Sequence, residues 1–143
     1  MATKGGPAGA AALMVLGNDA LVRNDHKEAL RQFAAGYSLS PDLPILANNY
    51  AWSLANLGTP DPQRALKVID EALKTHGNDP RLHGTRGGIL AKLGRDKDAE
   101  SELSAAVAAG YKHPEVLSTL ANLRDRKKPS GASTSSPAAT PPG

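Results

Sequence analysis

Small and apolar residues recur along this chain with two spacings, one typical of a helix and one typical of a repeating unit. Within a unit, three such residues are separated by four and then three positions, which places them on one face of an α-helix. The triplet recurs 36 and then 34 residues further on, at Ala29, Phe33 and Gly36, at Ala65, Ile69 and Ala72, and at Ala99, Leu103 and Ala106. The chain is therefore predicted to repeat a unit of about 34 residues.

A second set of small residues predicts that each unit is a pair of antiparallel helices. It consists of Gly17, Ala51, Gly87 and Ala121, spaced by 34, 36 and 34 residues. Small side chains at these positions allow two helix backbones to approach closely. The two sets keep one register except for two extra residues near "GTPDP" (58–62).

Residues that favour the start of a helix support this pairing. Pro44, Pro80 and Pro114 each stand where a first helix begins, a position that needs no backbone N–H. Asp25 and Asp61 lie four residues before the alanine of a second helix, as helix N-caps do.

Further signals mark the remaining boundaries. Glu28 follows Asp25 by three residues, which is a capping-box spacing. Gly58 and Gly94 stand near the ends of first helices, where a left-handed residue is favoured. The predicted helices are 10–23, 26–39, 44–57, 61–75, 80–93, 96–109 and 114–126, the last of them a single helix that covers the third pair.

Composition is consistent with close-packed helices and narrows the classes of function. Aromatic residues make up 3% of the chain, so the core must consist of Ala, Leu and Val. The absence of cysteine excludes disulfides and thiolate metal sites. A net charge of +3 is small for a dedicated nucleic-acid binder. The apolar stretch 8–17 is too short to span a bilayer, and we expect a protein of the cytoplasm with no membrane association.

The repeat resembles the tetratricopeptide repeat. The segments "GNDALVRNDHKEALRQFAAGYSLSP" and "GGILAKLGRDKDAESELSAAVAAG" carry the resemblance, as does the pairing of "NNYAWSLA" with "RALKVIDEALKTHGNDP". It implies an all-α, right-handed superhelical solenoid, with repeats at 10–43, 44–79 and 80–113 and a capping helix at 114–126. Residues 1–9 are expected to be flexible. The tail 127–143, which is rich in Pro, Ser and Ala, is expected to be disordered.

The resemblance also implies a noncatalytic module whose concave groove, lined by the first helices, binds a peptide or protein segment. Such a module would act as an adaptor or assembly factor. No catalytic constellation, metal site or cofactor motif accompanies it, since the four histidines are scattered. The alternatives are a self-associating scaffold that uses groove and tail, an RNA-binding helical-repeat protein, and an enzyme fragment whose catalytic domain lies beyond the tail.

The single tryptophan, Trp52, has two interpretations. It lies about 100° around the helix from Ala51, on a face that it shares with Asn48 and Asn49. On that face an indole and side-chain amides would offer a flat apolar contact and hydrogen bonds to a peptide. Alternatively, Trp52 packs against the neighbouring first helix at the edge of the core.

Some chaperone-docking members of the family bind a C-terminal carboxylate through a set of basic and Asn residues. This sequence matches that set at Asn18, Asn49 and Arg81, and departs from it at Met14 and Thr85. The departures remove two cations, and with them much of the charge-assisted hydrogen bonding that a carboxylate needs. An acidic or extended peptide remains a plausible ligand for the matching residues.

The third helix pair departs from the pattern of the others. His83 and Arg86 stand where the other units have Leu, Ala or Tyr. One interpretation is a small polar notch where a partner's backbone approaches Gly84 and Gly88, with Arg81 beside it. The other, which we favour, is a loosened helix with Arg86 reaching out to water. Taken together, the candidate groove residues are Asn18, Asn48, Asn49, Trp52, Arg81, Gly84, Gly88 and Lys92.

The basic run "RDRKK" (124–128) also has two interpretations. It could contact nucleic acid or another acidic surface. We favour the interpretation that it complements the dipole of the last helix and stays solvated.

Overall fold

The structure is a computed structural model and describes residues 6–127. Seven α-helices and no strand occur in this part of the chain. The helices are α1 (Gly6–Val22), α2 (His26–Leu39), α3 (Pro44–Asn56), α4 (Pro62–Thr75), α5 (Pro80–Lys92), α6 (Asp96–Ala108) and α7 (Pro114–Lys127).

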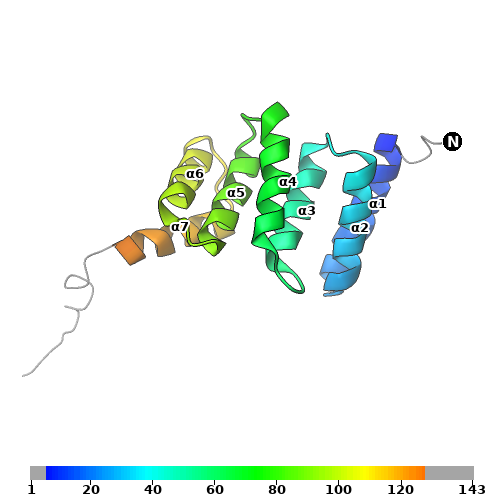
Figure 1. Cartoon of the computed structure of the whole chain (residues 1–143), viewed down its shortest axis with the longest axis horizontal. Helices are drawn as coiled ribbons and strands as arrows, with labels where there is room; N and C mark the ends of the chain where they lie inside the picture. Colours follow the sequence, from blue (N-terminus) through cyan, green and yellow to red (C-terminus); the bar gives the residue numbers. More distant parts are fainter. Residues whose placement is uncertain (1–5, 128–143) are drawn as a thin grey trace, which may run out of the picture.

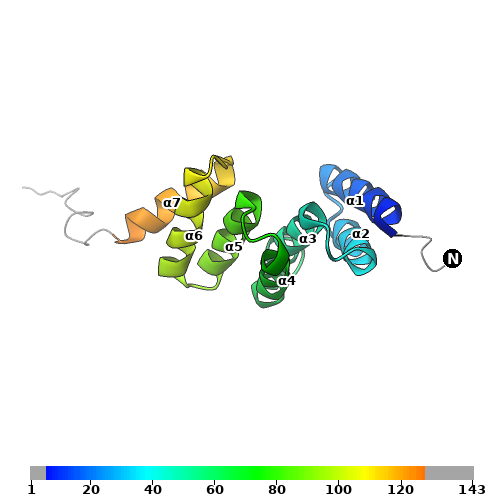
Figure 2. The same cartoon turned by 90° about the horizontal axis from the view of Figure 1, so that it is seen from above.

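The helices form a solenoid. The pairs α1/α2, α3/α4 and α5/α6 stand side by side in a row, and α7 follows the third pair (Figure 1). Viewed from above, α1 and α7 lie at opposite ends of this row (Figure 2). The architecture is therefore the predicted one of three helix pairs and a covering helix.

The local signals for helix starts are confirmed in the structure. Prolines occupy the first turn of α3 and α5, and α7 begins at Pro114. The carboxylates of Asp25 and Asp61 accept hydrogen bonds from the first-turn amides of α2 and α4. The capping box at Asp25 is only half formed, because the Glu28 carboxylate accepts from Arg31 and Gln32 instead.

The first helix differs from the prediction at its start. It begins at Gly6, four residues before predicted residue 10, with Pro7 in the first turn, where a missing backbone N–H costs nothing. Residues 6–9 of the segment expected to be flexible thus belong to α1, while residues 1–5 lie outside the described part. Lys127 belongs to α7, and the rest of the predicted tail also lies outside the described residues.

Glycines of the upstream set bring paired helices into close contact. A Cβ atom added at Gly17 would lie 2.5 Å from the ring of Phe33 on α2. One added at Gly87 would lie 2.5 Å from Cγ of Leu103 on α6. Phe33 and Leu103 are fully buried residues of the repeated triplets, as is Ile69 in the middle pair. The two sets of repeated residues thus pack against each other within a pair.

Two adjacent glycines of α5 allow a test of this packing. We expect Gly87→Ala to lower the free energy of unfolding by about 1–3 kcal/mol, because the methyl group overlaps Leu103. Gly88→Ala is the matched control: nothing lies within 4 Å of its added Cβ, so the higher helix propensity of Ala should stabilise the protein by up to about 1 kcal/mol. Urea unfolding followed by circular dichroism measures both. Equal effects of the two substitutions would contradict the close contact.

Candidate functional site

A groove of about 480 Å³ runs along one side of the solenoid, on the first helices of the pairs. The side chains that line it come from α3, α5 and α7, together with Leu21 of α1, Leu103 of α6 and residues that precede or begin α7. Six of the eight candidate residues line this groove, namely Asn48, Asn49, Trp52, Gly84, Gly88 and Lys92.

Trp52 combines the two environments that the sequence left open. Its half-buried ring packs against the core cluster, and the same ring lines the groove. Its indole N–H donates to Oε1 of Glu115 at 2.9 Å. Glu115 lies in the first turn of α7. The hydrogen bond therefore links α3 to α7, past the third helix pair. No pattern in the sequence predicts this contact.

Side-chain amides supply most of the polar lining contributed by α3. The side chains of Asn48, Asn49 and Asn56 all border the groove. The Asn56 amide donates to the backbone oxygen of Trp52 at 2.8 Å. Within residues 6–127, the buried Oδ1 atom of Asn48 has no hydrogen-bond partner. A buried polar atom without a partner is costly.

The charges in the groove are few and mostly paired. Arg126 contacts Asp96 of α6 at 3.2 Å, and Glu115 accepts from Trp52. Lys92 is exposed and forms no ion pair with any residue of the described part. Among these lining residues, Lys92 is therefore the cation available for an acidic group of a ligand.

The two candidate glycines of α5 have different surroundings. The space above Gly84 is filled, because an added Cβ would lie 2.9 Å from Cε2 of Tyr111 and 3.1 Å from Cγ2 of Val116. Tyr111 and Val116 therefore occupy the side of Gly84 on which a side chain would stand, while Gly84 itself borders the groove. Gly88 has open space above its Cα and borders the groove, which leaves room there for a ligand.

The remaining two candidates, Asn18 and Arg81, are not among the lining residues. Asn18 is exposed on α1. Arg81 is paired with Asp79, the N-cap of α5. The Asp79 carboxylate accepts hydrogen bonds from the backbone N–H of Arg81 and from Nη2 of the same residue, the latter at 2.8 Å. The side-chain hydrogen bond from Arg81 lowers the pKa of Asp79. Of the three residues that match the carboxylate-binding set, the groove thus holds only Asn49.

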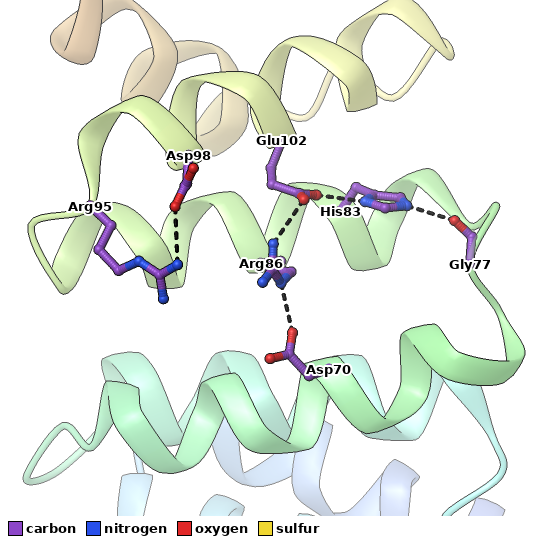
Figure 3. Close-up of polar contacts among 7 residues, drawn as sticks. All are labelled: Asp70, Gly77, His83, Arg86, Arg95, Asp98 and Glu102. Carbon is purple, nitrogen blue, oxygen red and sulfur yellow. Dashed lines mark hydrogen bonds and ion pairs between the residues drawn. The ribbon is translucent and has the colours of Figure 1, made fainter.

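Arg86 does not reach out to water, so the interpretation that we favoured for the third pair is wrong. Its side chain is 23% exposed and lies between two carboxylates (Figure 3). Nε donates to Asp70 of α4 at 2.6 Å, and Nη1 donates to Glu102 of α6 at 2.9 Å. Arg86 thereby joins α5 to its own partner helix and to the preceding pair.

His83 extends the same network. Its Nδ1 lies 2.6 Å from Oε1 of Glu102, and its Nε2 lies 2.6 Å from the Gly77 carbonyl oxygen (Figure 3). Both neighbours are acceptors, and only the imidazolium form can donate from both nitrogens. Desolvation lowers the pKa of His83, but the Gly77 carbonyl and Glu102 outweigh it, so the pKa is raised above its usual value. The network stabilises the charged ring.

The basic residues near the end of α7 form ion pairs that the sequence did not predict. Arg124 and Lys127 contact Glu100 at 3.3 and 2.9 Å, and Arg126 contacts Asp96. These contacts tie α7 to α6 while the cations remain exposed to solvent. The hydrogen bond from Lys127 lowers the pKa of Glu100.

Other site types find little support in residues 6–127. No group of three or more His, Asp or Glu side chains there is arranged to hold a metal ion. Among the same residues, no helix has both the length and the apolar character that crossing a membrane requires.

Comparisons with known proteins agree with this geometry. The tetratricopeptide repeat family model matches residues 57–123. No curated protein sequence matches the chain. The first TPR domain of Spaghetti (RPAP3), bound to the HSP90 peptide SRMEEVD, is similar with a TM-score of 0.71 at 18% identity, covering 82% of this chain and 91% of that one.

Two further solved structures are similar. The second TPR domain of human RPAP3, in complex with the HSP70 peptide SGPTIEEVD, has a TM-score of 0.69 at 17% identity, covering 83% of this chain and 98% of that one. The MamA RS-1 ArsTM double mutant has a TM-score of 0.66 at 29% identity, covering 81% and 64%. The seven helices fit three such repeats followed by a capping helix.

The His83 network predicts a pH-dependent stability. Because the folded-state pKa is raised, the stabilisation by His83 should be fully present below the usual pKa of about 6.5 and lost as the pH rises through the raised value. We expect the difference in unfolding free energy between wild type and His83→Gln to shrink as the pH rises through the folded-state pKa of His83. Denaturant unfolding at a series of pH values measures it. A constant difference would contradict the network.

The Trp52 contact is accessible to NMR because the chain has one tryptophan. We expect Glu115→Ala to shift the single indole N–H resonance strongly, since it removes the acceptor, and to cost less than about 1 kcal/mol at this exposed position. Glu71→Ala, another exposed carboxylate, is the control and should leave the resonance in place. An unchanged resonance in Glu115→Ala would show that the bond is absent in solution.

Proposed function

We propose that this domain is a noncatalytic interaction module that binds an extended segment of another protein in the groove. The observation that carries the proposal is the convergence of Trp52, Asn48, Asn49, Gly88 and Lys92 on one hollow. Amides can donate to and accept from a peptide backbone, and an indole supplies apolar contact area. The resulting role is that of an adaptor or assembly factor.

The open space at Gly88 supports an extended ligand. A ligand backbone can come close to α5 there, because no side chain of the described residues fills the space. Asn48 and Asn49 on the neighbouring α3 would then hydrogen-bond to that backbone across the groove. Since these contacts are to backbone groups, they tolerate many ligand sequences.

The charge distribution argues against an intact clamp for a C-terminal carboxylate. Arg81 is paired with Asp79 outside the lining, and Thr85 stands in the groove where the clamp has a cation. The similar domains of RPAP3 hold chaperone peptides that end in EEVD. For this chain we propose instead a segment with an acidic side chain opposite Lys92, bound mainly through its backbone.

Site-directed crosslinking tests the proposal. The chain has no cysteine, so Gly88→Cys can be labelled with benzophenone maleimide at one site. Gln63→Cys, exposed on α4, is the matched control. After irradiation in lysate of the source organism, we expect Gly88→Cys to crosslink to a defined segment of a partner protein, mapped by mass spectrometry, and Gln63→Cys not to do so.

A second variant separates specific binding from accidental proximity. Asn49→Ala removes a groove amide that makes no hydrogen bond within residues 6–127, so we expect the fold to persist, which circular dichroism checks. In the Gly88→Cys background it should reduce the crosslink several-fold. Crosslinking that is equal at both labels, or unchanged by Asn49→Ala in a folded protein, would refute groove binding.

A further inference from the structure

The stacking of successive repeats uses the same two helix positions each time. The first position is Leu46 in α3, Leu82 in α5 and Val116 in α7, with exposures of 0%, 0% and 6%. At the second position, the Tyr50 ring contacts the Tyr37 ring of the preceding pair in a tilted arrangement, with centroids 5.2 Å apart, and Arg86 binds Asp70 of the preceding pair. These positions form the face that a first helix turns toward the pair before it.

The same face is uncovered on α1. Ala12 and Leu16 lie 34 residues before Leu46 and Tyr50, and so occupy the equivalent positions. Ala12 is exposed and Leu16 is 49% exposed; the adjacent Val15, at the position equivalent to the groove residue Asn49, is 62% exposed. No helix precedes α1 in the described part, and α1 lies at one end of the row (Figures 1 and 2). The stacking interface of the solenoid therefore continues onto an open surface.

The chemistry of this surface differs from that of a solvent-exposed solenoid end. End repeats normally need a polar outer face for solubility. Residues 6–18 include no charged side chain. Of the six large apolar side chains that are exposed in the described part, Val15, Leu16 and Val22 belong to α1, whereas the other three lie singly on α2, α3 and α7.

We propose that the outer face of α1 binds the same face of a second copy of this chain, giving a two-fold symmetric dimer. Association of like faces buries Ala, Val and Leu against one another and leaves no charge unpaired. The isolated apolar residues elsewhere on the described surface offer no comparable partner face. Two-fold dimers are the commonest oligomers, and the alanines of α1 permit close helix contact.

A two-fold axis permits a parallel or an antiparallel pair of α1 helices; the proposed pair is antiparallel, which opposes the two helix dipoles, with the axis near the middle of the apolar segment. Ala12 and Val15 then lie near the axis, and the Asp19–Arg23 ion pair of each copy stays at the rim, where it is solvated. The groove is lined from α1 by Leu21 alone, and none of the residues near the axis lines it.

Analytical ultracentrifugation of the 143-residue chain tests the dimer over a wide range of concentrations. We expect a monomer–dimer equilibrium in wild type and only monomer in Leu16→Glu, which folds because Leu16 is about half exposed. Leu117→Glu, with a comparable exposure of 43% on α7, is the control and should dimerise like wild type. A wild type that is monomeric throughout would overturn the proposal. Loss of the dimer in Leu117→Glu but not in Leu16→Glu would also overturn it.

Engineered cysteines test the arrangement directly, since the chain has none of its own. Under mild oxidation, Ala12→Cys should form a disulfide-linked dimer, because the two copies of residue 12 lie near the two-fold axis. Ala105→Cys, equally exposed on α6, should remain monomeric. Equal crosslinking of both variants, or of neither, would refute the antiparallel contact at α1.

Discussion

The close approach of two helices within each repeat is the contact on which the rest of the structure depends. At Gly17 and Gly87 a large side chain of the second helix occupies the space that a methyl group would need. Phe33 and Leu103 are fully buried because those positions lack a side chain. Tight pairs can then stack in register, and the stacking aligns the first helices along one side of the molecule, where the groove forms.

The features that the sequence predicted well are those decided by near neighbours in the chain. The Pro and Asp signals at helix starts, and the spacing of small residues, act within one turn or one helix pair. Most of the groove could be predicted in the same way, because Asn48, Asn49 and Trp52 share a helix face that the repeat directs to the concave side. The missed features join side chains from different helices. The pairs Trp52–Glu115 and Arg86–Glu102 depend on rotamers and on distances between elements, which periodicity does not encode.

One signal for the Arg86 network was nevertheless present. A charged residue at a position that is apolar in every other repeat needs a counter-charge if it is to be buried. Glu102 and Asp70 lie 16 residues away on either side, on the two second helices that flank α5. The second junction of the solenoid therefore adds a polar network to its apolar contacts, whereas Tyr37 and Tyr50 meet at the equivalent place in the first. Hydrogen bonds have stricter geometry than apolar contacts, so this network restricts the orientation of α5 relative to α4.

This orientation matters because the groove crosses the same junction. Asn48 and Trp52 stand on one side of it and Gly88 and Lys92 on the other, so the width of the groove depends on how the second and third repeats are set against each other. The Arg86 network restrains the relative orientation of the two repeats by joining α5 to α4. On the groove side, the Trp52–Glu115 hydrogen bond restrains it by joining α3 to α7. A ligand that competes for the Trp52 N–H would remove one of these two restraints and leave the other intact.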